Sequence, residues 1–167
     1  NMFHKKDRPI PRRRLGKTGV EVSILGLGGE GALRTFGKEK EADEIINTAI
    51  DLGINYFESA RAYSGSESYY GLALRERRDN IFLASKSHAR DKKGALEHLE
   101  ETLKNMKTDR LDLWQIHDVR TEDDVNRIFG PDGALEAFVE ARQKGLVRFI
   151  GVTGHHDPLI IKKCLES

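Results

Sequence analysis

The sequence of 167 residues predicts an α/β fold of the (β/α)8 TIM-barrel type, incomplete in this chain and preceded by a β-hairpin. Short apolar runs alternate with amphipathic stretches about five times, which is typical of parallel strands joined by right-handed helical crossovers. Several apolar runs end in a residue suited to chemistry, and the carboxyl ends of barrel strands carry the active site. Since a closed barrel has eight strands and about 250 residues, we expect the chain to be part of a longer protein.

The N-terminal region is expected to contain an irregular arm and a hairpin. Residues 1–13 are polar and hold two of the four prolines, so we predict an arm there and place the partial barrel domain at 14–167. Turn glycines between short strand-like pieces predict a β-hairpin over residues 14–22. The apolar residues 22–27 then predict the first buried strand.

The rest of the chain alternates regularly between helix and strand. Gly53 ends the first expected helix, and Pro158 takes the favoured first position of the last one. The expected helices cover 38–52, 67–75, a stretch that starts near 92, 122–128, 134–144 and 158–166. The expected strands cover 54–58, 81–85, 111–117 and 147–152.

The composition is that of a globular protein with balanced charge, with 38% hydrophobic residues and a net charge of +1. A basic stretch in the first 14 residues is more simply explained as a solvated terminus than as a nucleic-acid arm, so no nucleic-acid partner is expected. No apolar run is long enough to cross a membrane, and no membrane partner is expected. The only cysteine, Cys164, cannot form an internal disulfide and favours a reducing, cytoplasmic location.

A glycine-rich motif at residues 26–31, GLGGEG, follows the first expected strand. Its spacing satisfies G-x-G-x-x-G, which in a doubly wound fold opens a helix and binds a dinucleotide phosphate. Here the next helix begins only near Lys38, after a loop, so the barrel is the better interpretation. Glycines at a strand end can let a ligand approach the backbone, and Gly28 is one expected cofactor-binding residue.

The candidate catalytic residues lie at or just beyond strand ends: Glu58, Tyr63, Lys86 and His117. Lys86 ends an otherwise apolar strand, so its ammonium needs a partner, and Glu58 on the neighbouring strand is the obvious one. The ammonium would lower the pKa of Tyr63 from about 10, so that the phenol could donate a proton near neutral pH. His117 could polarise a carbonyl oxygen or orient a substrate. The residues alone leave open that Glu58 and Lys86 are only a buried ion pair that braces the barrel.

Five segments of the chain carry a resemblance to a known family: Arg14–Ser23, Tyr56–Tyr63, Ala84–Lys86, Asp112–His117 and Lys144–Thr153. In this order they resemble the opening hairpin of the aldo-keto reductases, their Asp-Thr-Ala-x-x-Tyr segment, the strands that carry their lysine and histidine, and their fifth strand. The chain is therefore similar to the N-terminal part of that family, over about five of its eight barrel units.

The resemblance implies reduction of aldehydes and ketones to alcohols with NADPH, with a small-molecule carbonyl compound as substrate. It implies that Tyr63 is the general acid, that Lys86 tunes it, and that His117 orients the carbonyl. Glu58 stands where the family has an aspartate, which is shorter by one methylene.

The resemblance also implies where the nicotinamide lies. The family often has Ser-Asn, whose asparagine holds the nicotinamide amide, where this chain has Thr153 and Gly154. His155 or the backbone could substitute for that asparagine. The expected cofactor-binding residues are therefore Thr153, Gly154 and His155, together with Gly28.

Three other possibilities remain open from the sequence. The glutamate at position 58 and the short chain are compatible with a non-catalytic binding subunit on the same scaffold, as in potassium-channel subunits of the family. The unpaired edges of an incomplete sheet could let copies of the chain self-associate. A metal-dependent barrel hydrolase would use His88, His117, His155, His156 and Glu58, but no H-x-H or H-E-x-x-H spacing occurs and no metal is expected.

Overall fold

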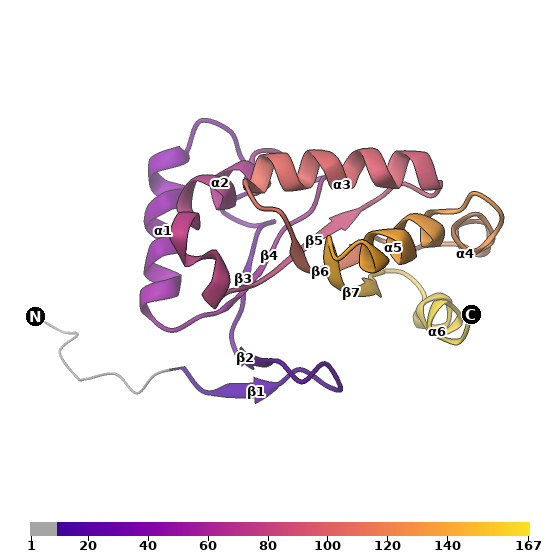
Figure 1. Ribbon diagram of the computed structural model, residues 1–167, viewed down its shortest axis with the longest axis horizontal. Coiled ribbons are helices and arrows are strands. Elements are labelled where there is room, and N and C mark those ends of the chain that lie inside the picture. The colour runs from indigo at the N-terminus through magenta and orange to yellow at the C-terminus, as the bar shows by residue number, and fades with distance from the viewer. Residues whose placement is uncertain (1–9) are drawn as a thin grey trace, which may run out of the picture.

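The computed structural model describes residues 10–167 and contains a parallel sheet with helices along its outer side (Figure 1). The strands are β1 (Arg12–Arg14), β2 (Glu21–Ser23), β3 (Leu27–Gly28), β4 (Tyr56–Glu58), β5 (Phe82–Ser87), β6 (Leu111–Ile116) and β7 (Val147–Val152). The helices are α1 (Glu39–Asp51), α2 (Ser66–Ala73), the 3₁₀ helix η1 (Arg75–Asn80), α3 (Lys92–Met106), α4 (Glu122–Phe129), α5 (Ala134–Gln143) and α6 (Pro158–Glu166).

The main sheet has the order β3-β4-β5-β6-β7, and each strand pairs with the next in parallel. Strand order that equals chain order, with a helix after each strand, is the arrangement of consecutive β/α units. The predicted α/β architecture is therefore confirmed, with β3 and β7 as its outer strands. The antiparallel pair β1–β2 forms a separate hairpin that lies below the sheet in Figure 1.

The hairpin and the first barrel strand differ from their expected bounds. Pairing in the hairpin starts at Arg12, two residues earlier than predicted, while the part of the expected arm at 1–9 lies outside the described residues. The prediction of one buried strand over 22–27 is wrong, because the chain bends between β2 and β3. Ile24 and Leu25 lie in this bend and are 61% and 56% exposed. Hydrophobicity alone does not reveal a bend between a hairpin and a sheet.

The helices cover the sheet through large and small buried residues that fit together. The ring of Trp114 on β6 stacks on Phe138 of α5, with centroids 3.6 Å apart and planes 8° apart. Phe57 on β4 meets Tyr70 of α2 edge to face, with centroids 6.0 Å apart. Burial of this apolar surface is the main source of stability for the layered structure. None of the helices in residues 10–167 has the length and apolar character needed to cross a membrane.

The inner side of the sheet carries an aromatic row near the amino ends of the strands. Tyr56 pairs in register with Phe82, and their rings stack with centroids 5.1 Å apart. Phe82 in turn stacks on Phe149 of β7 at 6.3 Å. Because side chains alternate along a strand, Glu58 and Lys86 lie on the same side as this row, toward the carboxyl ends. The aromatic row therefore lies on the same face as the candidate site, nearer to the amino ends of the strands.

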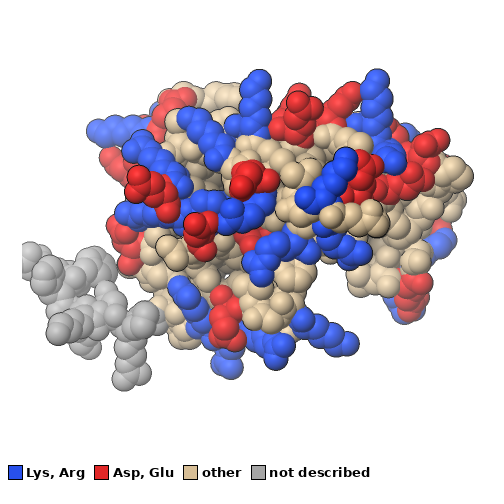
Figure 2. Space-filling view, viewed as in Figure 1, with Lys and Arg blue, Asp and Glu red and all other residues tan. Residues whose placement is uncertain are grey.

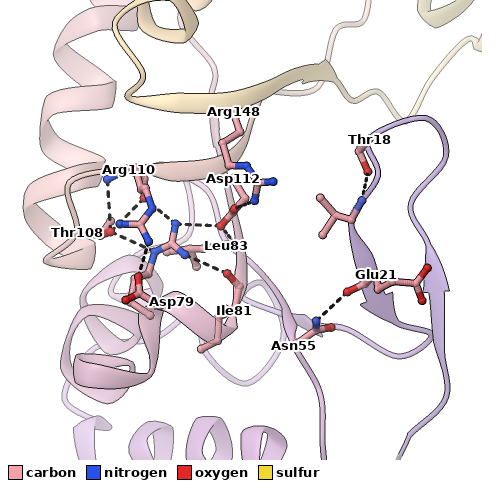
Figure 3. Close-up of polar contacts among 12 residues, drawn as sticks. Thr18, Glu21, Asn55, Asp79, Ile81, Leu83, Thr108, Arg110, Asp112 and Arg148 are labelled. Atoms are coloured by element: carbon pink, nitrogen blue, oxygen red, sulfur yellow. Dashed lines mark hydrogen bonds and ion pairs between the residues drawn. The ribbon is translucent and has the colours of Figure 1, made fainter.

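A charged cluster centred on Asp112 ties the amino ends of three strands together (Figure 3). Asp112 is 4% exposed, and its carboxylate accepts hydrogen bonds from the Leu83 N–H at 3.0 Å and from Arg148 at 2.6 Å. The guanidinium of Arg78 lies 2.9 Å from the same carboxylate and also donates to the carbonyls of Ile81 and Arg110. The buried charges of this cluster are therefore well supplied with partners.

A single amide joins the hairpin to the sheet. Asn55 accepts a hydrogen bond from the Ser23 N–H at 2.7 Å and donates to the carbonyl of Glu21 at 3.0 Å, the latter drawn in Figure 3.

The surface of the molecule carries charges of both signs: Figure 2 shows basic and acidic side chains largely interspersed over the face in view. Such a surface gives no sign of a large region of one charge on that face.

Candidate active site

The carboxyl ends of β4 and β5 bring Glu58 and Lys86 together. Parallel pairing sets Glu58 opposite Ala84, two residues before Lys86. The Lys86 ammonium forms an ion pair with the Glu58 carboxylate and donates a hydrogen bond to the Ser59 carbonyl at 2.9 Å. Lys86 is 4% exposed, so both contacts lie in a site largely shielded from solvent. Glu58 is therefore long enough to reach the lysine from its strand.

Tyr63 and His117 lie beside this ion pair. Tyr63 follows β4 in a tight turn, in which its N–H donates to the Ala60 carbonyl at 3.0 Å, and its side chain is buried with 5% exposure. The Lys86 Nζ atom is 4.8 Å from the centre of the Tyr63 ring. The His117 ring, just beyond β6, meets the Tyr63 ring edge to face at 5.5 Å. The structure thus gathers all four candidate catalytic residues at one end of the sheet.

The electrostatics of this group favour a charged lysine and a neutral histidine. Burial lowers the pKa of Lys86 to about 8, the negative charge of Glu30 acts in the opposite direction, and Lys86 is therefore a cation at neutral pH. Burial and the positive charge of Lys86 lower the pKa of His117 to about 4. A neutral imidazole carries one N–H donor, and the hydrogen bonds found for His117 among the described residues involve only its backbone.

The pKa of Tyr63 corrects one expectation. Burial is the largest cause that raises the pKa of Tyr63, and the negative charge of Glu30 raises it further. The guanidinium of Arg34, which lies over the ring, lowers this pKa. The prediction that this pKa is lowered is wrong for this structure, because burial and the negative charge of Glu30 outweigh the positive charges nearby. Tyr63 is consequently a protonated phenol at neutral pH, which is the form that a proton donor needs.

The residues expected to bind the nicotinamide lie next to His117. The N–H of Asp118 donates to the Thr153 hydroxyl oxygen at 3.0 Å, which leaves the hydroxyl proton available as a donor. At Gly154 a Cβ atom would lie 2.5 Å from Ile161 and 2.8 Å from the Val119 carbonyl, so this position requires glycine. The Thr153 hydroxyl therefore fits an amide, while Gly154 offers backbone groups only.

The other two expected cofactor-binding residues lie at opposite sides of the same rim. His155 is exposed just beyond β7, and Gly28 ends β3 with its ideal Cβ position 3.7 Å from the Glu58 carboxylate. The neighbouring Gly29 N–H donates to the same carboxylate at 3.4 Å. Gly28 thus borders the candidate catalytic residues.

The histidines do not form the metal site of the alternative hydrolase. Within residues 10–167, no group of three or more His, Cys, Asp or Glu side chains is arranged to hold a metal ion. The closest pair, His88 and His98, has ring centroids 4.6 Å apart, and His98 shares a hydrogen bond with the Ser87 hydroxyl. A pair of histidines is fewer than the three protein ligands that hold a catalytic zinc ion.

Sequence reasoning missed three residues around the site. Glu30 and Arg34 form an ion pair at 3.0 Å in the loop after β3, and Arg34 lies 5.6 Å from the centre of the Tyr63 ring. No periodic pattern marks this loop. Glu67 is a buried carboxylate of α2, and its position three residues before the buried Tyr70 is a signal that could have shown it to face the core.

The comparison with known proteins agrees with this geometry. Residues 24–167 match the sequence model of the Aldo/keto reductase family. The chain belongs to the aldo-keto reductases. The resemblance seen in the sequence is thereby confirmed, and the partial sheet described above is the corresponding part of the aldo-keto reductase barrel.

Individual known proteins resemble the chain over most of its length. It is 33% identical to the uncharacterized oxidoreductase YqkF of Bacillus subtilis, with 93% of this chain and 52% of that protein covered. It is 31% identical to L-galactose dehydrogenase of Arabidopsis thaliana, with 87% and 49% covered. The holo form of aldo-keto reductase AKR11C1 from Bacillus halodurans is 31% identical with a TM-score of 0.80, covering 94% of this chain and 54% of that one. The chain thus spans about half the length of the curated relatives it matches.

Proposed function

We propose that the protein is an NADPH-dependent oxidoreductase that reduces small aldehydes and ketones to alcohols, with Tyr63 as the general acid. The observation that carries the proposal is the buried phenol of Tyr63 between the Lys86 ammonium and the neutral His117 ring. The three groups come from β5 and from the segments that follow β4 and β6, and they meet at the end of the sheet where barrel enzymes act. The relationship to a protein named L-galactose dehydrogenase supports redox chemistry of this kind.

Each residue has a role that follows from its environment. The His117 N–H donates a hydrogen bond to the substrate oxygen and holds it near Tyr63. The Tyr63 hydroxyl then gives its proton to that oxygen as negative charge develops on it. The Lys86 ammonium beside the ring stabilises the tyrosinate that is left behind, and Glu58 keeps the lysine in place.

The residues present fit the nicotinamide end of NADPH. When bound, the cofactor supplies the hydride that reaches the carbonyl carbon. The Thr153 hydroxyl, the backbone of Gly154 and the exposed His155 would hold the nicotinamide amide, and Gly28 would let the ring approach Glu58 and Lys86. The rest of the cofactor would rest on the barrel units that the relatives have beyond the matched half, so we expect this chain alone to bind NADPH weakly.

A titration with NADPH followed by a carbonyl panel tests the proposal. Cofactor fluorescence measures binding to the chain, both alone and extended by the three remaining β/α units of a relative such as YqkF. We expect weak binding by the chain alone, and tight binding with reduction of several aldehydes by the extended protein. Tight binding without turnover of any carbonyl compound would contradict the reductase and favour the alternative below.

The alternative is a non-catalytic subunit that binds NADPH on the same scaffold. Gly154 favours it, because the close contacts with Ile161 and the Val119 carbonyl exclude the asparagine side chain that the family often uses to orient the nicotinamide. A subunit that senses the cofactor needs affinity but not an oriented hydride. The same carbonyl panel separates the two functions.

A further inference from the structure

A buried carboxylate lies behind the candidate site, on the helix side of the sheet. Glu67 of α2 is 2% exposed and accepts four hydrogen bonds. One oxygen accepts from the hydroxyls of Ser85 at 2.8 Å and Thr102 at 2.7 Å. The other accepts from Arg61 at 3.0 Å and from the Asn105 amide at 3.2 Å. Both oxygens are therefore fully used, as a buried charge requires.

Two of these four donors belong to the segments that carry the catalytic residues. Ser85 directly precedes Lys86 on β5. Arg61 lies in the turn between Glu58 and Tyr63, and its backbone N–H donates to the Lys86 carbonyl at 3.0 Å. Glu67 thus binds the turn that presents the phenol and the strand that presents the ammonium, and no other described side chain bonds to both.

The other two donors fix the carboxylate itself. Thr102 and Asn105 are on or near the end of α3, away from the site, and they hold Glu67 against the outer helix layer. Arg61 has a second partner, the exposed Glu101 at 2.5 Å, so its charge does not depend on Glu67 alone. A carboxylate needed only for stability would not have to bond to both catalytic segments. The pattern indicates that Glu67 fixes the relative position of two segments.

We infer that Glu67 is a positioning residue, which sets the distance between the Tyr63 phenol and the Lys86 ammonium. The inference rests on the proposed reductase function for its effect on catalysis. Proton transfer is sensitive to displacements of about 1 Å, which can cost about 100-fold in rate. Without the Glu67 contacts, the turn and the strand would keep their backbone hydrogen bonds, such as that from Arg61 to the Lys86 carbonyl, but lose the side-chain link that limits small shifts between them.

The substitution Glu67→Gln tests the inference with little change of shape. The amide oxygen can still accept from Ser85 and Thr102, whereas the amide nitrogen faces the donors of Arg61 and Asn105. We expect kcat for carbonyl reduction to fall about 10- to 100-fold, with the KM for NADPH changed less than about 3-fold. Thr102→Val is the matched control, because it removes one bond from the same carboxylate on the side away from the site; its kcat should stay within about 3-fold.

Amide hydrogen exchange supplies a readout that does not depend on activity. We expect Glu67→Gln to speed exchange of the Arg61 N–H about 10-fold or more relative to the amides of α1, and Thr102→Val to leave that ratio unchanged. If Glu67→Gln folds poorly, Ser85→Ala breaks only the link to the Lys86 strand and should still lower kcat more than Thr102→Val does.

The outcomes separate this inference from the proposed function. Equal loss of kcat in Glu67→Gln and Thr102→Val, or a uniform rise of exchange across α2 and α3, would overturn the positioning role. If the extended protein without substitutions has no reductase activity, the proposed function is overturned. The hydrogen exchange of the Arg61 N–H then decides the positioning role by itself.

Discussion

The two ends of the same sheet each bury a charged residue, but they use it differently. At the amino end, Asp112 is bonded to two arginines and a backbone N–H, and Arg78 is bonded in turn to two carbonyls. At the carboxyl end, Lys86 is paired with Glu58, and the neighbouring Tyr63 and His117 rings are buried and meet edge to face.

This difference supports the proposal that the amino end serves stability and the carboxyl end chemistry. A buried carboxylate whose oxygens are already bonded holds strands together and has little capacity to bind anything else. A buried imidazole whose N–H has no partner in the described part of the protein can still donate a hydrogen bond to a ligand. Substitutions at the amino end should therefore change the free energy of unfolding, and those at the carboxyl end should change turnover.

The largest effect on stability is expected at the amino end. Asp112→Ala leaves the half-buried Arg78 without its carboxylate, and removal of one partner from a buried pair typically costs about 3–5 kcal/mol. Urea denaturation measures this loss. Asp79→Ala is the control: its carboxylate also bonds an arginine, Arg110, but is 81% exposed, so the cost should stay below about 1 kcal/mol. Equal costs for both variants would show that the Asp112 cluster is not a buried anchor.

After Tyr63, the proposed general acid, the largest effect on binding and turnover is expected at His117. His117→Ala removes the N–H donor at the substrate oxygen, and kcat/KM should fall about 100-fold. Steady-state assay of the extended protein measures this. His88→Ala, a change to an exposed histidine at the same rim, should have little effect. If the two variants behave alike, His117 does not contact the substrate.

A smaller effect is expected in the pH dependence of stability. Burial and the charge of Lys86 lower the pKa of His117 from 6.5 to about 4. Between these values the unfolded chain binds a proton that the folded chain does not, so the free energy of unfolding rises with pH through this window and is lost on acidification. His117→Gln should flatten this part of the curve, while the exposed His156→Gln should not. A curve unchanged by His117→Gln would mean that the buried imidazole does not titrate as described.

The fold and the positions of the main candidate site residues could be predicted because local patterns carry them. Apolar runs such as 111–117 and helical stripes such as 134–144 depend on burial, which the sequence displays directly. Glu58, Lys86 and His117 each follow such a run, and parallel strands bring their ends together.

The rest depends on tertiary contacts that no local pattern contains. The bend at Ile24 and Leu25 arises where the chain passes from the hairpin to the sheet. The raised pKa of Tyr63 depends on burial and on Glu30, which comes from a loop without periodicity. The role of Glu67 depends on donors up to 38 positions away in the chain.

The measurement that tests the central claim most directly is the rate of carbonyl reduction by Tyr63→Phe in the extended protein. The account predicts that kcat falls about 1,000-fold, with NADPH affinity and the free energy of unfolding unchanged, because only the proton donor is lost. Tyr70→Phe, which removes a buried hydroxyl that donates to the Leu27 carbonyl at 3.0 Å, should lower stability but keep turnover. Turnover by Tyr63→Phe at the same rate as the extended protein with Tyr63 in place would contradict the account.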